Sequence, residues 1–130
     1  MPGGRDKTPA RLTKQLSRDG YTILIGRNAQ ESETLLSHQA APTDWWLHVR
    51  GAGSGHVIIR SEGRPDAVPL STIQEAAVWA ARQSKMKHSA IVPVVYTQRK
   101  HVTKVKGGAA GKVTYRQEKT IFVDPTSDEA

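Results

Sequence analysis

The sequence contains no cysteine among its 130 residues, which excludes a disulfide framework, a thiolate zinc site and a cysteine nucleophile. This absence also fits a reducing compartment, so we expect the protein in the cytoplasm. No run of residues approaches the roughly 20 apolar positions that a membrane-spanning helix needs, and residues 1–20 lack the apolar stretch of a signal peptide. We therefore expect a protein that is neither exported by that route nor integral to a membrane.

Acidic residues are scarce in one part of the chain. The net charge is +7, and residues 82–119 contain a single acid, Glu118, against ten basic residues: Arg82, Lys85, Lys87, Arg99, Lys100, Lys104, Lys106, Lys112, Arg116 and Lys119. Such an imbalance creates a positive field that attracts polyanions, RNA or DNA before an anionic membrane. The alternative is a solvated basic surface that only keeps the protein soluble.

The length fits one domain with a single core. Residues 1–17 are polar and basic, and they predict a flexible basic tail; the domain is expected at 18–125, followed by a C-terminal tail at 126–130. Short apolar or alternating runs predict strands at 21–25, 44–50, 56–60, 90–96, 113–116 and 120–123. Pro93 cannot donate to a strand ladder, and it predicts an edge strand or a bulge.

Two segments have helical character. Thr72 and Glu75 form a capping-box pattern, and small residues recur at helical spacing behind them, which predicts a principal helix at about 70–87. A weaker pattern predicts a short additional helix at 29–38. The expected fold class is α+β, with a mainly antiparallel sheet packed by the principal helix.

The segment 44–50, DWWLHVR, carries most of the site prediction. Strand alternation assigns Trp45 and every second residue after it to the core, and it assigns the residues between them to the opposite face, namely Trp46, His48 and Arg50. An aromatic ring, an imidazole and a guanidinium in a row are a poor core and a good binding surface. Trp46 would stack against a nucleic-acid base there.

His48 and His56 lie at the two ends of the glycine-rich segment 51–55, GAGSG, and are expected to face each other across it. Two imidazoles need a third ligand to hold zinc, and only Asp44 lies near in sequence, so we predict no metal and no cofactor. A buried, loop-bracing role and contact with RNA are the alternatives for the pair. The glycine segment does not open a helix, so it is no P-loop, but its amides and Ser54 would still hold an RNA phosphate.

The segment 104–112, KVKGGAAGK, predicts a mobile, glycine-rich basic loop. No serine sits in a nucleophile elbow and no acidic pair has a recognisable setting, so we predict no catalytic residue. Two other interpretations stay open. One is a small enzyme acting on RNA or a nucleotide, with His48 or His56 as acid and base; the other is a ribosome-associated protein-interaction module.

Several segments together resemble the RNA-binding (R) domain of the NFACT proteins. They are DWWLHVR at 44–50, GHVII at 55–59, Pro69 with TIQEAA at 72–77, SK at 84–85, VPVVYT at 92–97 and KTIFVDP at 119–125. The resemblance runs in order over about 18–125. It implies a role in ribosome quality control, in which family members bind large ribosomal subunits that carry a stalled peptidyl-tRNA.

The resemblance also implies site residues. Those at the family's characteristic positions are Trp46, His48, His56, Ser84, Lys85 and Tyr96, and the basic loop matches the family's positively charged segment. The chain departs from the family at 53–55, where GSG replaces the usual Pro-Gly-Ser. It also lacks the other domains of full-length members, so we expect a single-domain protein.

These observations predict a cytoplasmic RNA-binding protein that engages tRNA or large-subunit ribosomal RNA, with no membrane partner. The predicted RNA-binding residues are Trp46, His48, Arg50, Ser54, His56, Lys85, Tyr96, Arg99, Lys100, Lys104, Lys106 and Lys112. The lysines and arginines would neutralise phosphates, and the two histidines would shape the turn or hydrogen-bond the RNA.

Overall fold

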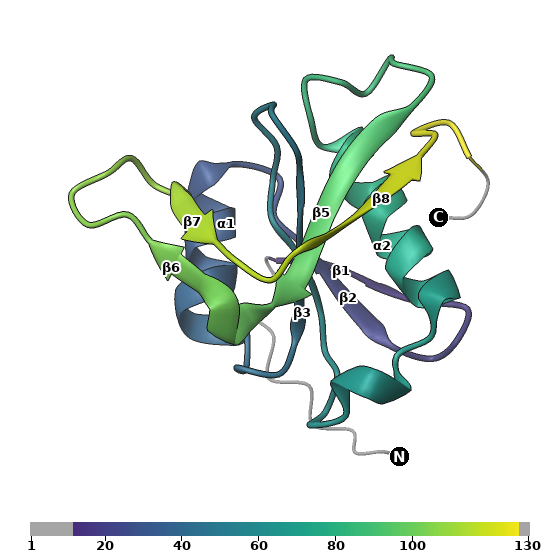
Figure 1. The fold of residues 1–130 in the computed structure, drawn as a ribbon, viewed down its shortest axis with the longest axis horizontal. Helices are drawn as coiled ribbons and strands as arrows, with labels where there is room; N and C mark the ends of the chain where they lie inside the picture. Colours follow the sequence, from purple (N-terminus) through teal and green to yellow (C-terminus); the bar gives the residue numbers. More distant parts are fainter. Residues whose placement is uncertain (1–11, 128–130) are drawn as a thin grey trace.

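The computed structural model describes residues 12–127, which adopt the predicted α+β fold (Figure 1). Within that range, six strands form one antiparallel sheet in the order β1-β2-β4-β3-β5-β8, and β6 pairs with β7 in a separate hairpin. The strands are β1 (Thr13–Leu16), β2 (Thr22–Ile25), β3 (Trp45–Val49), β4 (Val57–Ile59), β5 (Val92–Gln98), β6 (Val102–Lys104), β7 (Val113–Tyr115) and β8 (Lys119–Val123). The helices are α1 (Ala29–Thr34), continued by a π-helical turn η1 (Leu35–Gln39), and α2 (Leu70–Arg82), with 3-10 turns at Pro65–Ala67 and Arg99–His101.

Strand β1 lies where we predicted the end of a flexible tail, so that boundary is wrong. Thr13 pairs with Ile25 and Leu16 with Thr22, which makes β1 an edge strand of the sheet. Most of its side chains are exposed, and such a strand shows no hydrophobic alternation for a sequence pattern to reveal. The rest of the predicted N-terminal tail, residues 1–11, and residues 128–130 of the C-terminal tail lie outside the described residues.

Helix α2 begins three residues earlier than a capping box at Thr72 would place it, and Pro69 is its N-cap. The Thr72 hydroxyl donates to Asp19 Oδ2 at 2.8 Å, and Glu75 Oε1 accepts from the Arg18 amide at 3.1 Å. The predicted capping box is therefore wrong, because both side chains bind the β1–β2 turn instead. The helix ends at Arg82 rather than near residue 87. In the described part of the chain, no helix is long and apolar enough to span a bilayer.

Pro93 does not mark an edge, because β5 lies between β3 and β8. Its carbonyl accepts a hydrogen bond from the Arg50 amide at 2.9 Å, just beyond Val49, the last residue of β3. The amide and carbonyl of one residue point to the same side of an antiparallel strand. The amide that proline lacks would therefore face the end of β3, so the sheet loses only a terminal hydrogen bond and β5 stays central.

Both faces of the sheet are covered, as Figure 1 shows, by α2 on one side and by α1 with the β6–β7 hairpin on the other. The buried side chains of the α2 face are aliphatic, and the alanines of α2 belong to the same cluster. Trp46 belongs to the other face, where it is 0% exposed among Leu35, Leu36 and Val95. The alternation predicted for β3 is thus correct, but the expectation that Trp46 faces solvent is wrong because a second layer buries that side.

Candidate nucleic-acid interface

A cleft of about 550 Å³ opens at the end of the sheet where residues 51–55 connect β3 to β4. The start of α1, the turn after α2 and the end of the β6–β7 loop complete its walls. Four cationic side chains line it, Arg27, Lys85, Lys87 and Lys112, together with both predicted histidines. No carboxylate lines the cleft within residues 12–127, so its local charge is strongly positive.

The glycine segment is held in place by its neighbours. A Cβ on Gly55 would lie 1.7 Å from the carbonyl oxygen of Gly26, so only glycine fits where these two stretches cross. The Gly55 amide donates to the Gln83 carbonyl, and the Lys85 amide donates to the Gly53 carbonyl, both at 3.3 Å. The glycine segment therefore fixes the backbone that carries Lys85 at the rim of the cleft.

Two serines shape the same region from inside. The Ser84 hydroxyl is buried, donates to the Ala81 carbonyl at 2.7 Å and accepts from the Met86 amide at 3.0 Å. It thereby folds the turn that presents Lys85 and Lys87. Ser54 Oγ accepts from the Val49 amide at 3.1 Å, which closes the β3 end of the glycine segment. Both serines have positioning roles in this structure.

His48 and His56 face each other as predicted, with ring centroids 5.4 Å apart and planes at 78°. His56 is 1% exposed, and its Nε2 lies 3.0 Å from the Gly111 carbonyl oxygen, which requires the proton on Nε2. Burial, followed by the charge of His48, lowers the pKa of His56 to about 4. Burial also lowers the pKa of His48, so both rings are neutral near pH 7.

This arrangement disfavours the acid–base interpretation for His56. The Nε2 proton of His56 is held by a backbone carbonyl, and the ring is shut away from solvent. A general base needs a reachable lone pair and a pKa near the working pH. Among residues 12–127, no three His, Asp or Glu side chains are grouped so that they could hold a metal ion.

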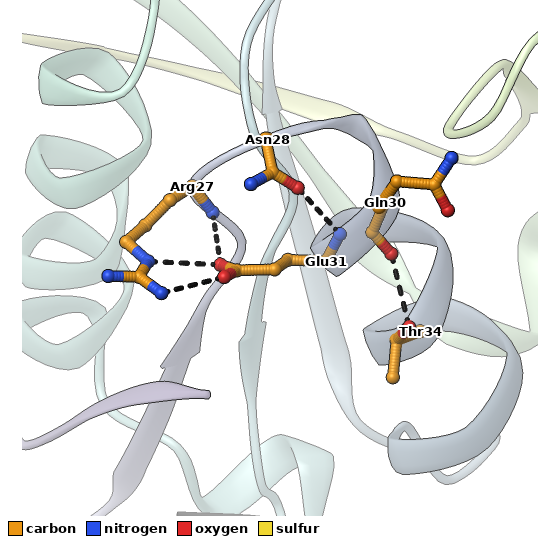
Figure 2. A network of polar contacts seen from close by, with 5 residues as sticks. All are labelled: Arg27, Asn28, Gln30, Glu31 and Thr34. Atoms are coloured by element: carbon orange, nitrogen blue, oxygen red, sulfur yellow. Dashed lines mark hydrogen bonds and ion pairs between the residues drawn. The ribbon is translucent and has the colours of Figure 1, made fainter. Parts of the chain in front are cut away.

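Arg27 is a cleft residue that the sequence did not single out. Its Nε and terminal nitrogen donate to the two Glu31 carboxylate oxygens at 3.1 and 2.7 Å (Figure 2). The Glu31 amide in turn donates to Asn28 Oδ1, the cap of α1, at 2.9 Å. Glu31 raises the pKa of the Arg27 guanidinium and fixes its orientation. Arg27 and Lys87 lie far apart in sequence from the glycine segment, so no local motif joins them to it.

The β6–β7 hairpin docks against α1 and extends the positive surface. Lys104 Nζ lies 2.6 Å from one Glu33 oxygen, and the Gly111 amide donates to the other oxygen at 3.0 Å. Lys104, Lys106 and Lys112 line a second hollow of about 400 Å³, and Lys112 lines both hollows. The hairpin lysines are thus continuous with the cleft.

Comparison with known proteins agrees with this geometry. Residues 11–117 match the family model of the NFACT protein RNA binding domain. The chain belongs to this family. It is 46% identical over 112 residues to the Rqc2 homolog RqcH of Bacillus subtilis (strain 168), and 36% identical over 118 residues to that of Streptococcus suis (strain 05ZYH33). These matches cover 86% and 89% of the chain but 19% and 21% of the relatives, so the chain spans about a fifth of their length.

A solved structure has the same fold. The C-terminal part of the fibronectin/fibrinogen-binding protein from Streptococcus suis superposes with a TM-score of 0.82 and is 32% identical. The match covers 94% of this chain and 48% of that one. The described sheet, both helices and the hairpin therefore represent an architecture already seen in a solved protein.

Several predicted site residues of this NFACT domain lie outside the cleft. Tyr96 packs edge-on against Trp45 at 5.7 Å, on the α2 face of the sheet. Arg50 donates to Thr120 Oγ1 at 3.2 Å and lies 3.7 Å from Glu118. The structure does not bring Tyr96 or Arg50 together with the histidines.

Arg99 and Lys100 are also displaced from the cleft. The Arg99 guanidinium donates to the carbonyls of Leu36 and Val102 at 2.9 and 2.8 Å, which ties the hairpin to η1. Lys100 follows the end of β5 and its amide bonds to Pro42, near the end of the sheet remote from the cleft. The predicted residues that do converge on the two hollows are His48, Ser54, His56, Lys85, Lys104, Lys106 and Lys112.

Proposed function

We propose that this domain is a cytoplasmic, non-catalytic binder of tRNA or large-subunit ribosomal RNA in ribosome quality control. The observation that carries the proposal is the charge of the cleft, which is lined by four cations and, within the described residues, by no carboxylate. Phosphate groups complement such a surface. The family description supports RNA as the ligand. The relatives named Rqc2 homolog RqcH support a role in ribosome quality control.

The β6–β7 hairpin extends the proposed contact surface, since it projects from the body of the domain in Figure 1. Lys106 and Lys112 are exposed on its loop, and Lys112 also reaches the cleft. An RNA backbone lying across both hollows would exchange its counterions for these ammonium groups. Because phosphates carry no sequence information, this part of the binding should be insensitive to RNA sequence.

A filter-binding titration of tRNA and a ribosomal RNA fragment at several salt concentrations tests the proposal. If about five phosphates are neutralised, log K against log salt should have a slope of roughly −3.5 for single strands and roughly −4.5 for duplexes. The double variant Lys106→Glu/Lys112→Glu should flatten the slope and lower the affinity for both RNAs by similar factors. This pair leaves the Lys104–Glu33 ion pair intact, so the hairpin stays docked.

A matched control is Lys14→Glu with Arg64→Glu, which makes the same change of charge at exposed positions outside both hollows. It should leave the slope nearly unchanged. A flat salt response, or no binding of either RNA at low salt, would refute the RNA proposal. Ribosome association that survives ribonuclease would then favour the protein-interaction module.

A further inference from the structure

Three lysines at the cleft, Lys85, Lys87 and Lys112, have no carboxylate partner among residues 12–127. The acids of α1, Glu31 and Glu33, are engaged by other cations. Like charges gathered in one concavity repel one another, and an anion that enters removes this repulsion. The cleft is therefore suited to an anionic occupant rather than to a neutral one.

The floor of the cleft holds a planar group in a fixed orientation. His48 stacks on Trp46 at 5.6 Å with planes only 6° apart, and His56 meets it edge-on. Trp46 and His56 are buried, whereas His48 stays partly exposed and lines the cleft. Packing from two sides therefore immobilises the His48 imidazole while one part of it faces the hollow.

Backbone donors also belong to the cleft. The amides of Gly53 and Ser54 donate to no group among residues 12–127, and both residues line the cleft. Amides exposed in such a turn bind phosphate oxygens. The cleft thus combines three components: a cationic rim, free backbone donors and an immobilised ring.

We infer that the cleft receives one unpaired nucleotide of the bound RNA, with its phosphate among Arg27, Lys85 and Lys112 and its base against His48. The inference rests on the proposed function and specifies the ligand of the same site. The volume of about 550 Å³ lies within the ~300–1,000 Å³ usual for small-ligand sites, which suits a single nucleotide.

The recessed position of His48 is the reason for an unpaired nucleotide. In an A-form duplex the bases are stacked and paired, so their faces cannot reach a ring at the floor of a cleft. A base that is splayed out of its strand can stack on an imidazole, which is how unpaired RNA is commonly recognised. The exposed hairpin lysines have no such requirement and should bind either form.

Fluorescence anisotropy with a labelled ten-residue single-stranded RNA and a blunt duplex of the same length tests the inference. Lys85→Gln and His48→Gln should each lower the affinity for the single strand by about tenfold. This is the effect expected from the loss of one base or phosphate contact. Both should change duplex affinity by less than about twofold. Lys106→Gln, outside the cleft, is the matched control and should weaken both RNAs equally.

A second measurement uses the wild-type protein and does not depend on the folding of a variant. The ring-proton NMR signals of His48 should shift when the single strand is added and stay unchanged with the duplex. An otherwise identical single strand with abasic sites should bind without shifting them, because it has the phosphates and lacks the bases.

The outcomes separate this inference from the function on which it rests. Equal effects of Lys85→Gln and His48→Gln on both RNAs, with salt-dependent binding retained, would overturn the nucleotide pocket and leave the RNA-binding function standing. Unchanged His48 signals with the single strand would do the same. No binding of any RNA at low salt would refute both.

Discussion

The two faces of the six-stranded sheet are both buried but differ in chemistry. On the α2 face, aliphatic strand residues meet the alanines of the helix, and the indole nitrogen of Trp45 donates to the Pro65 carbonyl at 3.0 Å. On the α1 face, Trp46 Nε1 and His56 Nδ1 are buried without a hydrogen-bond partner among the described residues. Burying a polar atom unpaired is costly, so each such atom calls for a structural or functional explanation.

The position of the cleft agrees with this contrast. It opens at the border of the α1 face, beside the two histidines, and the turn after α2 completes its wall. On the α2 face Gln98 Oε1, opposite Trp45, also lacks a partner among the described residues, whereas on the α1 face two such rings contact His48, a residue of the cleft. The following predictions test that contrast, from the largest effect to the smallest.

Trp46→Ala should lower the free energy of unfolding by about 3–5 kcal/mol, because it removes a large side chain that is fully buried. Trp45→Ala should lower the free energy of unfolding by less, roughly 2 kcal/mol. Trp45 is partly exposed, and its replacement removes one hydrogen bond. Urea denaturation of the two variants measures both effects. A larger loss for Trp45 would show that the α1 face contributes less to stability than its burial indicates.

Acidification should weaken the α1 face specifically. His56 has a folded-state pKa of about 4 against an ordinary 6.5, so the unfolded chain binds its proton more readily between these values. Its contribution is therefore complete above pH 6.5 and is lost as the pH falls to about 4, a change of about 3 kcal/mol.

Urea titrations across this pH window measure the loss. His56→Gln should remove a large part of the pH dependence, because glutamine has no proton to bind there, and His48, whose pKa burial also lowers, should contribute to the part that remains. The control is His88→Gln, at an exposed histidine remote from the buried pair in sequence. This variant should retain the pH dependence of stability. An equally steep dependence in both variants would mean that another group titrates.

Gly55→Ala should destabilise the domain by about 1–3 kcal/mol or more, because its Cβ would lie 1.7 Å from the Gly26 carbonyl oxygen. Gly53→Ala, two residues away, should be tolerated, since the nearest atom to its Cβ is Lys85 Cε at 3.9 Å. Thermal melts of the two variants give the comparison. Equal melting temperatures would show that the crossing of these segments adapts more easily than its geometry indicates.

Glu33→Gln should have the smallest effect and loosen only the hairpin. It removes the charge that holds Lys104 and weakens the acceptor of the Gly111 amide. Exchange of the Gly111 amide should accelerate by less than about tenfold, as for a half-exposed ion pair, with α2 unaffected. Glu118→Gln, which breaks the Arg50 pair instead, should leave this amide unchanged.

Hydrogen exchange also tests the predicted mobility of the basic loop at 104–112. Rapid exchange is expected at Lys106 and Gly107, which form an exposed turn of the hairpin loop, and slower exchange at the docked Gly111. Protection of the whole loop equal to that of α2 would contradict the predicted mobility.

The sequence was sufficient for features that arise from local periodicity. Alternation in β3 separated Trp45 from Trp46 correctly, and helical spacing of alanines located α2 and the side of that helix that packs on the sheet. The glycine segment between His48 and His56 correctly indicated that the two rings face each other. In each case neighbours in sequence are neighbours in the element, so the pattern already contains the geometry.

Only the tertiary structure decided what covers each face and which charges meet. The burial of Trp46 depends on α1, η1 and a hairpin that follows more than fifty residues later, and the diversion of Thr72 and Glu75 from a cap depends on the distant β1–β2 turn. Arg27, His56, Lys85 and Lys112 converge on one cleft from four separate segments. Composition determined that the chain is basic and periodicity determined its elements, but long-range packing selects which cations share a cavity, because no local interaction encodes that choice.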